Sequence, residues 1–408
     1  MRDERVRQAL DRIAGLDGAL HAFTQVFVAD ATGSGPLDGM TVAVKDNIDV
    51  GGQVTTLGRP ASERAPAARD AEAVARLRRA GATIVGKTNL PEFASSAVTV
   101  NAHYGDARNP VATDRTAGGS SGGSAVAVAA GMAMTALGTD TGGSVLIPAA
   151  LTGICGYRPT PGRIGMEGVV PLSPSLDTVG ILAREPREIA ALARVLDAAF
   201  ETGSPAPTPE VAGLRVGVPG GHFAEADADV LARLDAAVRA LAGAGALVRA
   251  TDLPSAGPAI TNARVIYAVE VADVYARLLD RATTYAPAVE ARRAHPYGPA
   301  DLERARAFRE TWRAEVSRAF TEVDVLLTPT TPITAPPLGE PAEAATSALV
   351  RDTYPFCLAG TPCVSLPAGT SDGLPVGVTL TAPPGEDRHL LALAAVCRPI
   401  LAGAPITN

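Results

Sequence analysis

Residues 117–147 read AGGSSGGSAVAVAAGMAMTALGTDTGGSVLI, and the architecture expected of the rest of the chain follows from them. Two glycine-serine turns bracket an alanine-rich helix that ends near Gly131 and a short apolar strand at 133–137. A helix followed by a strand brings the chain back toward its starting edge, so the two turns should face each other. Because glycine lets consecutive backbone N–H groups converge on an anion, a serine in such a turn is a credible nucleophile.

A serine is a weak nucleophile until a base lies within hydrogen-bond reach. None of the five histidines stands in a nucleophile-elbow context: His21, His103, His222, His295 and His389. Lys45 is the other candidate, because it ends a short β-branched strand at 40–44, where a partly desolvated ammonium group can lose its proton near neutral pH. The competing interpretation of GGSSGG as a phosphate-binding loop is disfavoured, since no lysine stands at the start of the helix.

Taken in order, the motifs resemble those of the amidase signature family, which works through a serine, a cis-serine and a lysine. By this resemblance the lysine is Lys45 in AVKDNIDV, the cis-serine is Ser120 in GGSSGGS and the nucleophile is Ser144 in GTDTGGS. The two serines lie 24 positions apart, as in the family pattern. Similar segments continue along most of the chain, at 86–89, 175–180, 327–330 and 360–362.

The resemblance implies an α/β fold with a large mixed, twisted β-sheet covered by helices on both faces. It also implies hydrolysis of a small carboxylic amide through an acyl-enzyme on Ser144, with Ser120 relaying the proton and Lys45 accepting it. The expected oxyanion-hole donors are the backbone N–H groups of Thr141, Gly142, Gly143 and Ser144. Supporting roles, either in orienting the relay or in capping, are expected for Asp140 and Ser124. The implied mechanism needs no cofactor and no metal.

Two places depart from the family pattern and bear on the substrate. Ser144 is followed by Val145, Leu146 and Ile147, a stretch in which the family commonly has an arginine, and Cys357 stands where an asparagine is common. A carboxylate bound beside the nucleophile needs a cation, so the sequence predicts a neutral, moderately apolar acyl group. Two alternatives stay open: a glutamine-hydrolysing component of a tRNA-dependent amidotransferase, and a catalytically silent binding protein of the same fold.

The resemblance implies a small-molecule amide as the partner of this chain, a homodimer is possible, and composition argues against nucleic acid. The formal net charge of −7, from 36 basic and 43 acidic residues, offers no basic face to nucleic acid. The longest apolar run, 125–137, is too short to span a membrane, and the charged N-terminus is no secretory signal. We therefore expect a cytoplasmic protein whose four cysteines, which lack metal-binding spacing, are buried thiols.

The organisation expected is one domain over residues 1–408, with an internal junction near 201–213. The junction is suggested by a Pro/Ser/Thr-rich run, ETGSPAPTP, after which a new strand begins at 214–218. A glycine-rich loop is expected at 153–168, close to the site. In the second half the pattern predicts alternating helices and strands, with helices at 230–241, 265–279, 302–320 and 389–400 and strands at 247–250, 323–327, 363–367 and 376–380.

Overall fold

The computed structural model describes residues 2–197, 199–202, 209–280 and 283–402. Within these ranges, eleven strands form one mixed sheet in the order β1-β3-β2-β4-β6-β5-β10-β11-β9-β7-β8. The strands are β1 (Phe23–Ala29), β2 (Thr41–Lys45), β3 (Thr83–Thr88), β4 (Thr135–Asp140), β5 (Cys155–Arg158), β6 (Thr178–Ala183), β7 (Arg215–Pro219), β8 (Leu247–Thr251), β9 (Val325–Pro329), β10 (Cys363–Ser371) and β11 (Leu374–Thr381). The expected α/β fold with a large mixed sheet is confirmed.

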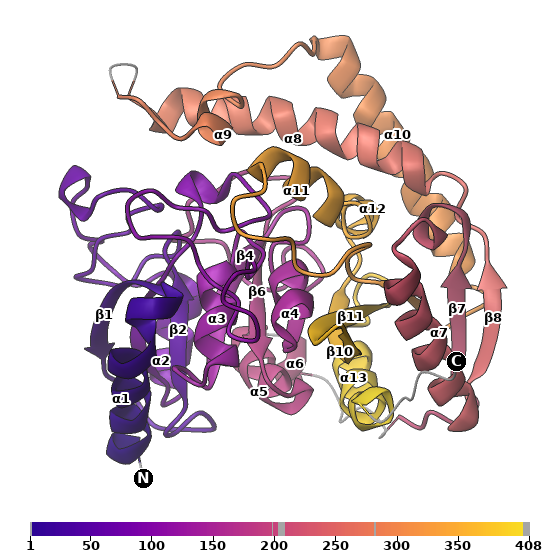
Figure 1. Ribbon diagram of the computed structural model, residues 1–408, viewed down its shortest axis with the longest axis horizontal. Helices are drawn as coiled ribbons and strands as arrows, with labels where there is room; N and C mark the ends of the chain where they lie inside the picture. Colours follow the sequence, from indigo (N-terminus) through magenta and orange to yellow (C-terminus); the bar gives the residue numbers. More distant parts are fainter. Residues whose placement is uncertain (1, 198, 203–208, 281–282, 403–408) are drawn as a thin grey trace.

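Helices pack around this sheet (Figure 1), and they are named here in the order in which they occur in the sequence. They are α1 (Arg2–Leu20), α2 (Glu72–Arg79), α3 (Gly122–Ala129), α4 (Leu146–Thr152), α5 (Pro186–Leu196), α6 (Ala199–Thr202), α7 (Ala228–Gly243), α8 (Ala256–Leu278), α9 (Pro287–Glu290), α10 (Pro299–Ala319), α11 (Ala342–Leu349), α12 (Tyr354–Ala359) and α13 (Asp387–Ala402). Three short 3₁₀ turns lie at Ala61–Glu63, Glu92–Ala94 and Gly221–Ala224.

At the interior strand β2, both faces of the sheet are covered. All five of its residues are buried, and successive side chains of a strand point to opposite faces. Val42 and Val44 join the hydrophobic cluster that contains residues of α2, α5 and α13, whereas Ala43 joins the cluster of α1 and α3. A strand buried on both faces reads as a continuous apolar run, as TVAV does here.

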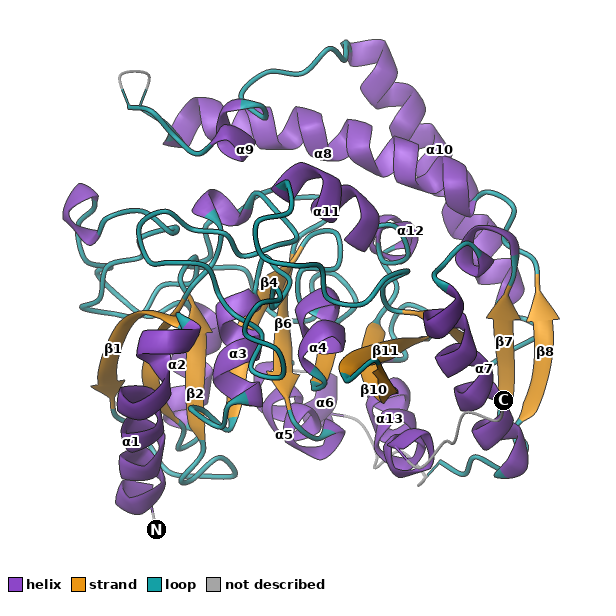
Figure 2. Cartoon of the chain, viewed as in Figure 1, coloured by secondary structure: helices purple, strands orange, loops and turns teal. Residues whose placement is uncertain are grey.

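The pairing of β2 with β4 sets where the chemistry lies. The two strands are parallel neighbours, with Val44 opposite Leu137, so their carboxyl ends meet at one edge of the sheet. Lys45 ends β2 and Asp140 ends β4 at this edge. Figure 2 shows loops gathered between this region of the sheet and the long helix α8.

An outer layer of helices covers that edge. Helices α8 and α10 lie across the end of the molecule, with α11 and α12 beneath them (Figure 1). Trp312 of α10 is fully buried and donates its indole N–H to the carbonyl of Pro355, 2.6 Å away, at the start of α12. This buried hydrogen bond fixes α12, whose first residue, Tyr354, reaches the nucleophile turn.

Near the site, two predictions differ from the structure and one strand was not predicted. The strand expected at 133–137 is β4 and ends only at Asp140, so it delivers the start of the nucleophile turn directly. The loop expected at 153–168 contains β5, and the strand β6 was not predicted. Every residue of β5 and β6 is buried, so neither shows the polar alternation that marks a half-exposed strand.

The junction expected near 201–213 falls partly on residues 203–208, which lie outside the described residues. Strands β7 and β8, which follow it, hydrogen-bond into the same sheet as β2 and β4, through β9. Across the described part of the chain, no helix is both long and apolar enough to cross a membrane.

Candidate active site

Two residues that are far apart in the sequence meet at the edge of the sheet. Lys45 comes from the end of β2, and Ser120 comes from the turn that precedes α3, a helix packed against β4. The Lys45 Nζ lies 2.7 Å from the Ser120 Oγ, and the Gly119–Ser120 peptide bond is cis. Sequence reasoning placed both residues in one site, and the structure brings them into hydrogen-bond contact.

Burial decides the protonation of Lys45. Its side chain is fully buried, and its Nζ also contacts the Thr139 side-chain Oγ1 at 2.9 Å and the Thr139 carbonyl oxygen at 3.4 Å. Desolvation lowers the pKa of Lys45 to about 7, although Asp140 and Asp177 each act to raise it. A lysine with this pKa is available as a neutral base near neutral pH.

The turn that holds Ser144 leaves only that residue accessible. Ser144 is half-buried, whereas Thr141, Gly142, Gly143 and Val145 are buried around it. The Ser144 carbonyl accepts a hydrogen bond from the backbone N–H of Ser121, at 3.1 Å. This bond ties the nucleophile turn to the turn that carries Ser120, so the two predicted glycine-serine turns do face each other.

Asp140 shapes the nucleophile turn rather than orienting the proton relay. Its carboxylate accepts hydrogen bonds from the backbone N–H groups of Gly143, at 2.9 Å, and Val145, at 2.7 Å. The N–H of Gly143, which was expected among the oxyanion-hole donors, is donated to Asp140 in this structure. The Oδ1 of Asp140 also forms a fully buried ion pair with Arg158, at 2.8 Å.

Ser124 was expected either to orient the relay or to act as a cap, and in the structure its hydroxyl contacts strands β3 and β4. Its hydroxyl donates to the carbonyl of Leu137, at 3.0 Å, and lies 2.6 Å from the hydroxyl of Thr88. Ser124 thereby fastens the first turn of α3 to strands β3 and β4. Its contribution to the site is the position of the helix that follows Ser120.

A second buried carboxylate, Asp177, holds the first residue of the turn. Its Oδ1 accepts from the Thr141 hydroxyl at 2.5 Å, and its Oδ2 accepts from the backbone N–H groups of Leu172 and Ser173. Burial raises the pKa of Asp177 to about 6, against these hydrogen bonds and the charge of Arg158. The segment 175–180 was recognised as a family motif, but no role for Asp177 followed from the sequence.

Helix α12 and the residue before it cover the turn. The Thr353 hydroxyl donates to the carbonyl of Gly142 at 2.6 Å, and the Tyr354 ring lies where a side chain on Gly142 would stand. Gly142 is thus required by this close approach. Tyr267 of α8 packs beside Tyr354, with ring centroids 6.4 Å apart, so the two residues form an aromatic layer over this end of the site.

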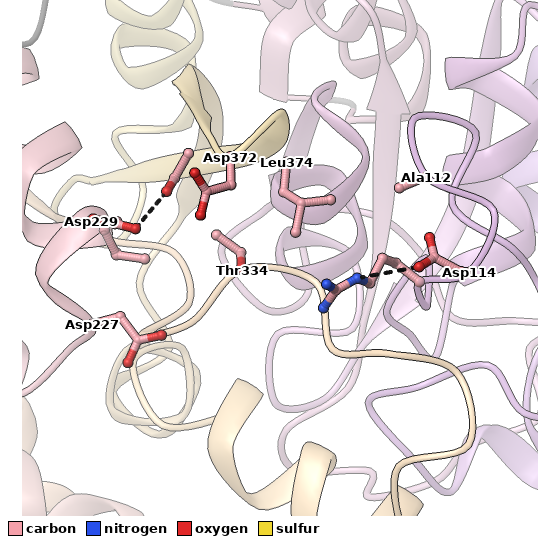
Figure 3. A pocket seen from close by; sticks show the side chains of 10 residues that line it. Ala112, Asp114, Asp227, Asp229, Thr334, Asp372 and Leu374 are labelled. Carbon is pink, nitrogen blue, oxygen red and sulfur yellow. Dashed lines mark hydrogen bonds and ion pairs between the residues drawn. The ribbon is translucent and has the colours of Figure 1, made fainter.

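A large surface cavity lies away from these residues. It has a volume of about 460 Å³, and its lining includes Arg115 and four aspartates. The aspartates, Asp114, Asp227, Asp229 and Asp372, are labelled in Figure 3. Its lining includes none of Lys45, Ser120 and Ser144. Among the described residues, no group of three or more His, Cys, Asp or Glu side chains is arranged to hold a metal ion.

A model of the amidase family matches residues 4–391 of this sequence, which include every residue of the site above. The chain belongs to the amidase signature family. Similar curated proteins include a component of the glutamyl-tRNA(Gln) amidotransferase of Symbiobacterium thermophilum, 36% identical over 96% of this chain and 92% of the relative. The corresponding component from Thermus thermophilus is 37% identical over 94% of this chain and 91% of the relative.

Several solved structures superpose closely on this fold. One belongs to a vestigial protein complex described as revealing the evolutionary origins of an s-triazine catabolic enzyme, with a TM-score of 0.87, 32% identity, and coverage of 100% of this chain and 96% of that chain. Another is 6-aminohexanoate cyclic dimer hydrolase, with a TM-score of 0.86, 27% identity, and coverage of 98% and 94%.

Proposed function

We propose that this chain hydrolyses a carboxylic amide through an acyl-enzyme on Ser144. The observation that carries the proposal is the fully buried Lys45, with a pKa lowered to about 7, in a 2.7 Å hydrogen bond with Ser120. A buried lysine amine next to a serine hydroxyl is a base, and the turn containing Ser144 is hydrogen-bonded to the turn containing Ser120.

In the proposed mechanism the proton moves along three residues. The Ser144 Oγ attacks the amide carbonyl, its proton passes to Ser120, and the Ser120 proton passes to the neutral Lys45. The ammonium of Lys45 then returns a proton through Ser120 to the leaving amine as the C–N bond breaks. Water then attacks the resulting ester and gives a proton through Ser120 to Lys45. The proton returns by the same residues to the Ser144 oxygen as the ester bond breaks, which releases the acid and restores Ser144.

The oxyanion that forms on the carbonyl oxygen needs backbone donors. Since Gly143 donates to Asp140, the proposed donors are the N–H groups of Thr141, Gly142 and Ser144. Loss of one such donor typically costs about 2.7–4 kcal/mol of transition-state stabilisation. The buried carboxylates Asp140 and Asp177 support the proposal because both hold this turn by hydrogen bonds.

The first candidate substrate is an amide whose acyl group is neutral and moderately apolar. Leu146, in the stretch where the family commonly has an arginine, is buried in a hydrophobic cluster with Tyr354 and brings no cation near Ser144. The aromatic layer of Tyr354 and Tyr267 offers apolar surface above the turn. Such a layer favours aliphatic or aromatic acyl groups over charged ones.

Glutamine is the second candidate substrate, and the names of the curated relatives favour it. One feature of the fold also supports it: Arg292, just after α9, is mostly buried and lies next to Tyr267 of this aromatic layer. The Arg292 guanidinium also forms an ion pair with the Glu343 carboxylate, with 3.0 Å between Nη2 and Oε2. A guanidinium in this place could pair with a substrate carboxylate. A partner chain belongs to this candidate, because the relatives are named as components of an amidotransferase.

The test compares glutamine with pentanamide, which has a methyl group in place of the carboxylate and no amino group. Higher kcat/KM for pentanamide supports the neutral acyl group, and higher kcat/KM for glutamine supports the second candidate. If Arg292 binds the carboxylate, Arg292→Leu lowers kcat/KM for glutamine alone, whereas Arg293→Leu is the matched control because Arg293 pairs with Glu290. A wild-type protein that neither hydrolyses amides nor reacts with a fluorophosphonate probe would instead be the silent binding protein.

A further inference from the structure

Asn47 lies two residues beyond Lys45 and is buried, with 4% of its surface exposed. Its side-chain Nδ2 lies 3.1 Å from the Thr139 Oγ1 and 3.4 Å from the carbonyl oxygen of Val170. The backbone is held as well, because the N–H of Val170 donates to the Asn47 carbonyl at 2.9 Å. Asn47 is therefore held between the end of β4 and the segment that contains Val170.

The direction of the Asn47 amide follows from its neighbours. A carbonyl oxygen such as that of Val170 only accepts hydrogen bonds, so the amide nitrogen, and not the amide oxygen, must face it. The same nitrogen faces Thr139, so the Thr139 hydroxyl oxygen accepts from Asn47. The Oδ1 of Asn47 has no hydrogen-bond partner among the described residues, so the Nδ2 contacts account for the orientation of this side chain.

Thr139 in turn is the main partner of Lys45 other than Ser120. A neutral lysine has two N–H groups and one lone pair, and it acts as a base only when the lone pair faces the Ser120 hydroxyl. Thr139 presents two oxygens to Lys45, its carbonyl and its Oγ1, at 3.4 and 2.9 Å. When both N–H groups point at these oxygens, the lone pair points at Ser120.

We propose that Asn47 is a positioning residue for the base: it anchors the Thr139 hydroxyl so that both N–H groups of neutral Lys45 are directed to Thr139 and its lone pair to Ser120. This inference rests on the proposed function. Without the anchor, the Thr139 hydroxyl can rotate and donate its own hydrogen to Lys45, which occupies the lone pair that Ser120 needs. Asn47 contacts protein groups, so its effect should fall on kcat rather than on KM.

The side-chain amide of Asn47 also adds no charge to the surroundings of Thr139 and Lys45. The charged groups that act on Lys45 are Asp140, at the end of β4, and Asp177, in the segment before β6, and both raise the pKa of Lys45. Asn47 holds Thr139 in place without adding a third carboxylate, which would stabilise the ammonium form. An asparagine is therefore the suitable residue type for this position.

The experiment is a double-mutant cycle on kcat, measured on the plateau of the pH profile. Asn47→Leu and Thr139→Val each remove one side of the Asn47–Thr139 hydrogen bond. If Asn47 acts only through Thr139, each single variant loses about tenfold or more in kcat with KM unchanged, and the double variant is no slower than Thr139→Val. Thr139→Ser, which keeps the hydroxyl, should restore kcat close to that of the wild type.

The pH profile gives an independent measurement that does not require the Asn47 variant to fold. Thr139→Val removes an oxygen that accepts from the ammonium form, so the acidic limb of kcat/KM moves to lower pH, and Thr139→Ser leaves it in place. Asn101→Leu is the matched control, since Asn101 is equally buried and donates to two backbone carbonyls, of Gly58 and Leu90, in another part of the fold. The acidic limb of kcat/KM for Asn101→Leu should stay at the pH of the wild type.

Additive losses in the double variant, or identical pH profiles for Thr139→Val and Thr139→Ser, would overturn the inference. Both results would still be obtained on an active wild-type enzyme, so the proposed function would stand. Absence of any amide hydrolysis and of probe labelling in the wild type would refute the proposed function itself, and the two failures are therefore distinguishable.

Discussion

Replacement of Arg158 by methionine should destabilise the protein by several kcal/mol. Arg158 is fully buried, and its guanidinium donates to the Asp140 carboxylate at 2.8 Å, to the Asp140 carbonyl at 2.7 Å and to the Leu176 carbonyl at 2.8 Å. Methionine fills much of the volume but leaves the Asp140 carboxylate buried without its counter-charge. Breaking a buried ion pair in this way typically costs about 3–5 kcal/mol.

Urea-induced unfolding at constant pH measures this loss as a change in midpoint at a constant slope. Arg69→Met is the matched control, because Arg69 and Glu167 are 2.6 Å apart but 80% and 61% exposed. The distance is shorter than in the buried pair, yet the expected loss is less than about 1 kcal/mol, since solvent screens the exposed charges. Burial, and not distance, sets the difference.

The double variant Arg158→Met/Asp140→Asn should recover part of the stability, because it removes the unpaired charge. Its kcat should stay low, since an amide at position 140 cannot accept from both Gly143 and Val145 as the carboxylate does. Equal losses for Arg158→Met and Arg69→Met, or no recovery in the double variant, would refute the reasoning.

Three further predictions follow from the site and its surroundings. With the pKa of Lys45 near 7, kcat/KM should fall about tenfold per pH unit below pH 7, because protonation removes the base, and a flat profile from pH 5 to 8 would contradict this assignment. Ser144→Ala should abolish fluorophosphonate labelling while its melting temperature stays close to that of the wild type, and labelling of this variant would show that another residue is the nucleophile. Asp352 is buried 3.7 Å from the Nε2 of His222, with one carboxylate oxygen lacking a partner among the described residues, and burial raises its pKa to about 8. The folded state thus holds a proton that the unfolded chain releases near pH 4, so wild-type stability should fall relative to Asp352→Asn as pH rises from about 4 to 8, and parallel stability curves would argue against this.

The local pattern of the sequence was sufficient for an alternation of helices and strands, whereas the large mixed sheet and the site residues were expected from the resemblance to the family. Apolar runs and glycine-serine turns identified β2, α3 and β4 within a few residues, and the motifs singled out Lys45, Ser120 and Ser144. These features depend on neighbours in the chain, through strand burial and turn geometry, so they are visible in one dimension. The strands β5 and β6 were not predicted, because full burial removes the alternation of apolar and polar residues on which such predictions rely.

The tertiary structure decided what these residues can do. Asp177, Arg158 and Tyr354 reach the nucleophile turn from segments that no spacing rule connects to Ser144, and the N–H of Gly143 is committed to Asp140 by the path of the turn. The same holds for Lys45: the sequence placed it at a strand end, but only packing by other segments removes water from its amine and brings its pKa to about 7. Desolvation depends on all surrounding atoms at once, and for that reason the strength of the base is a property of the folded chain and not of any motif.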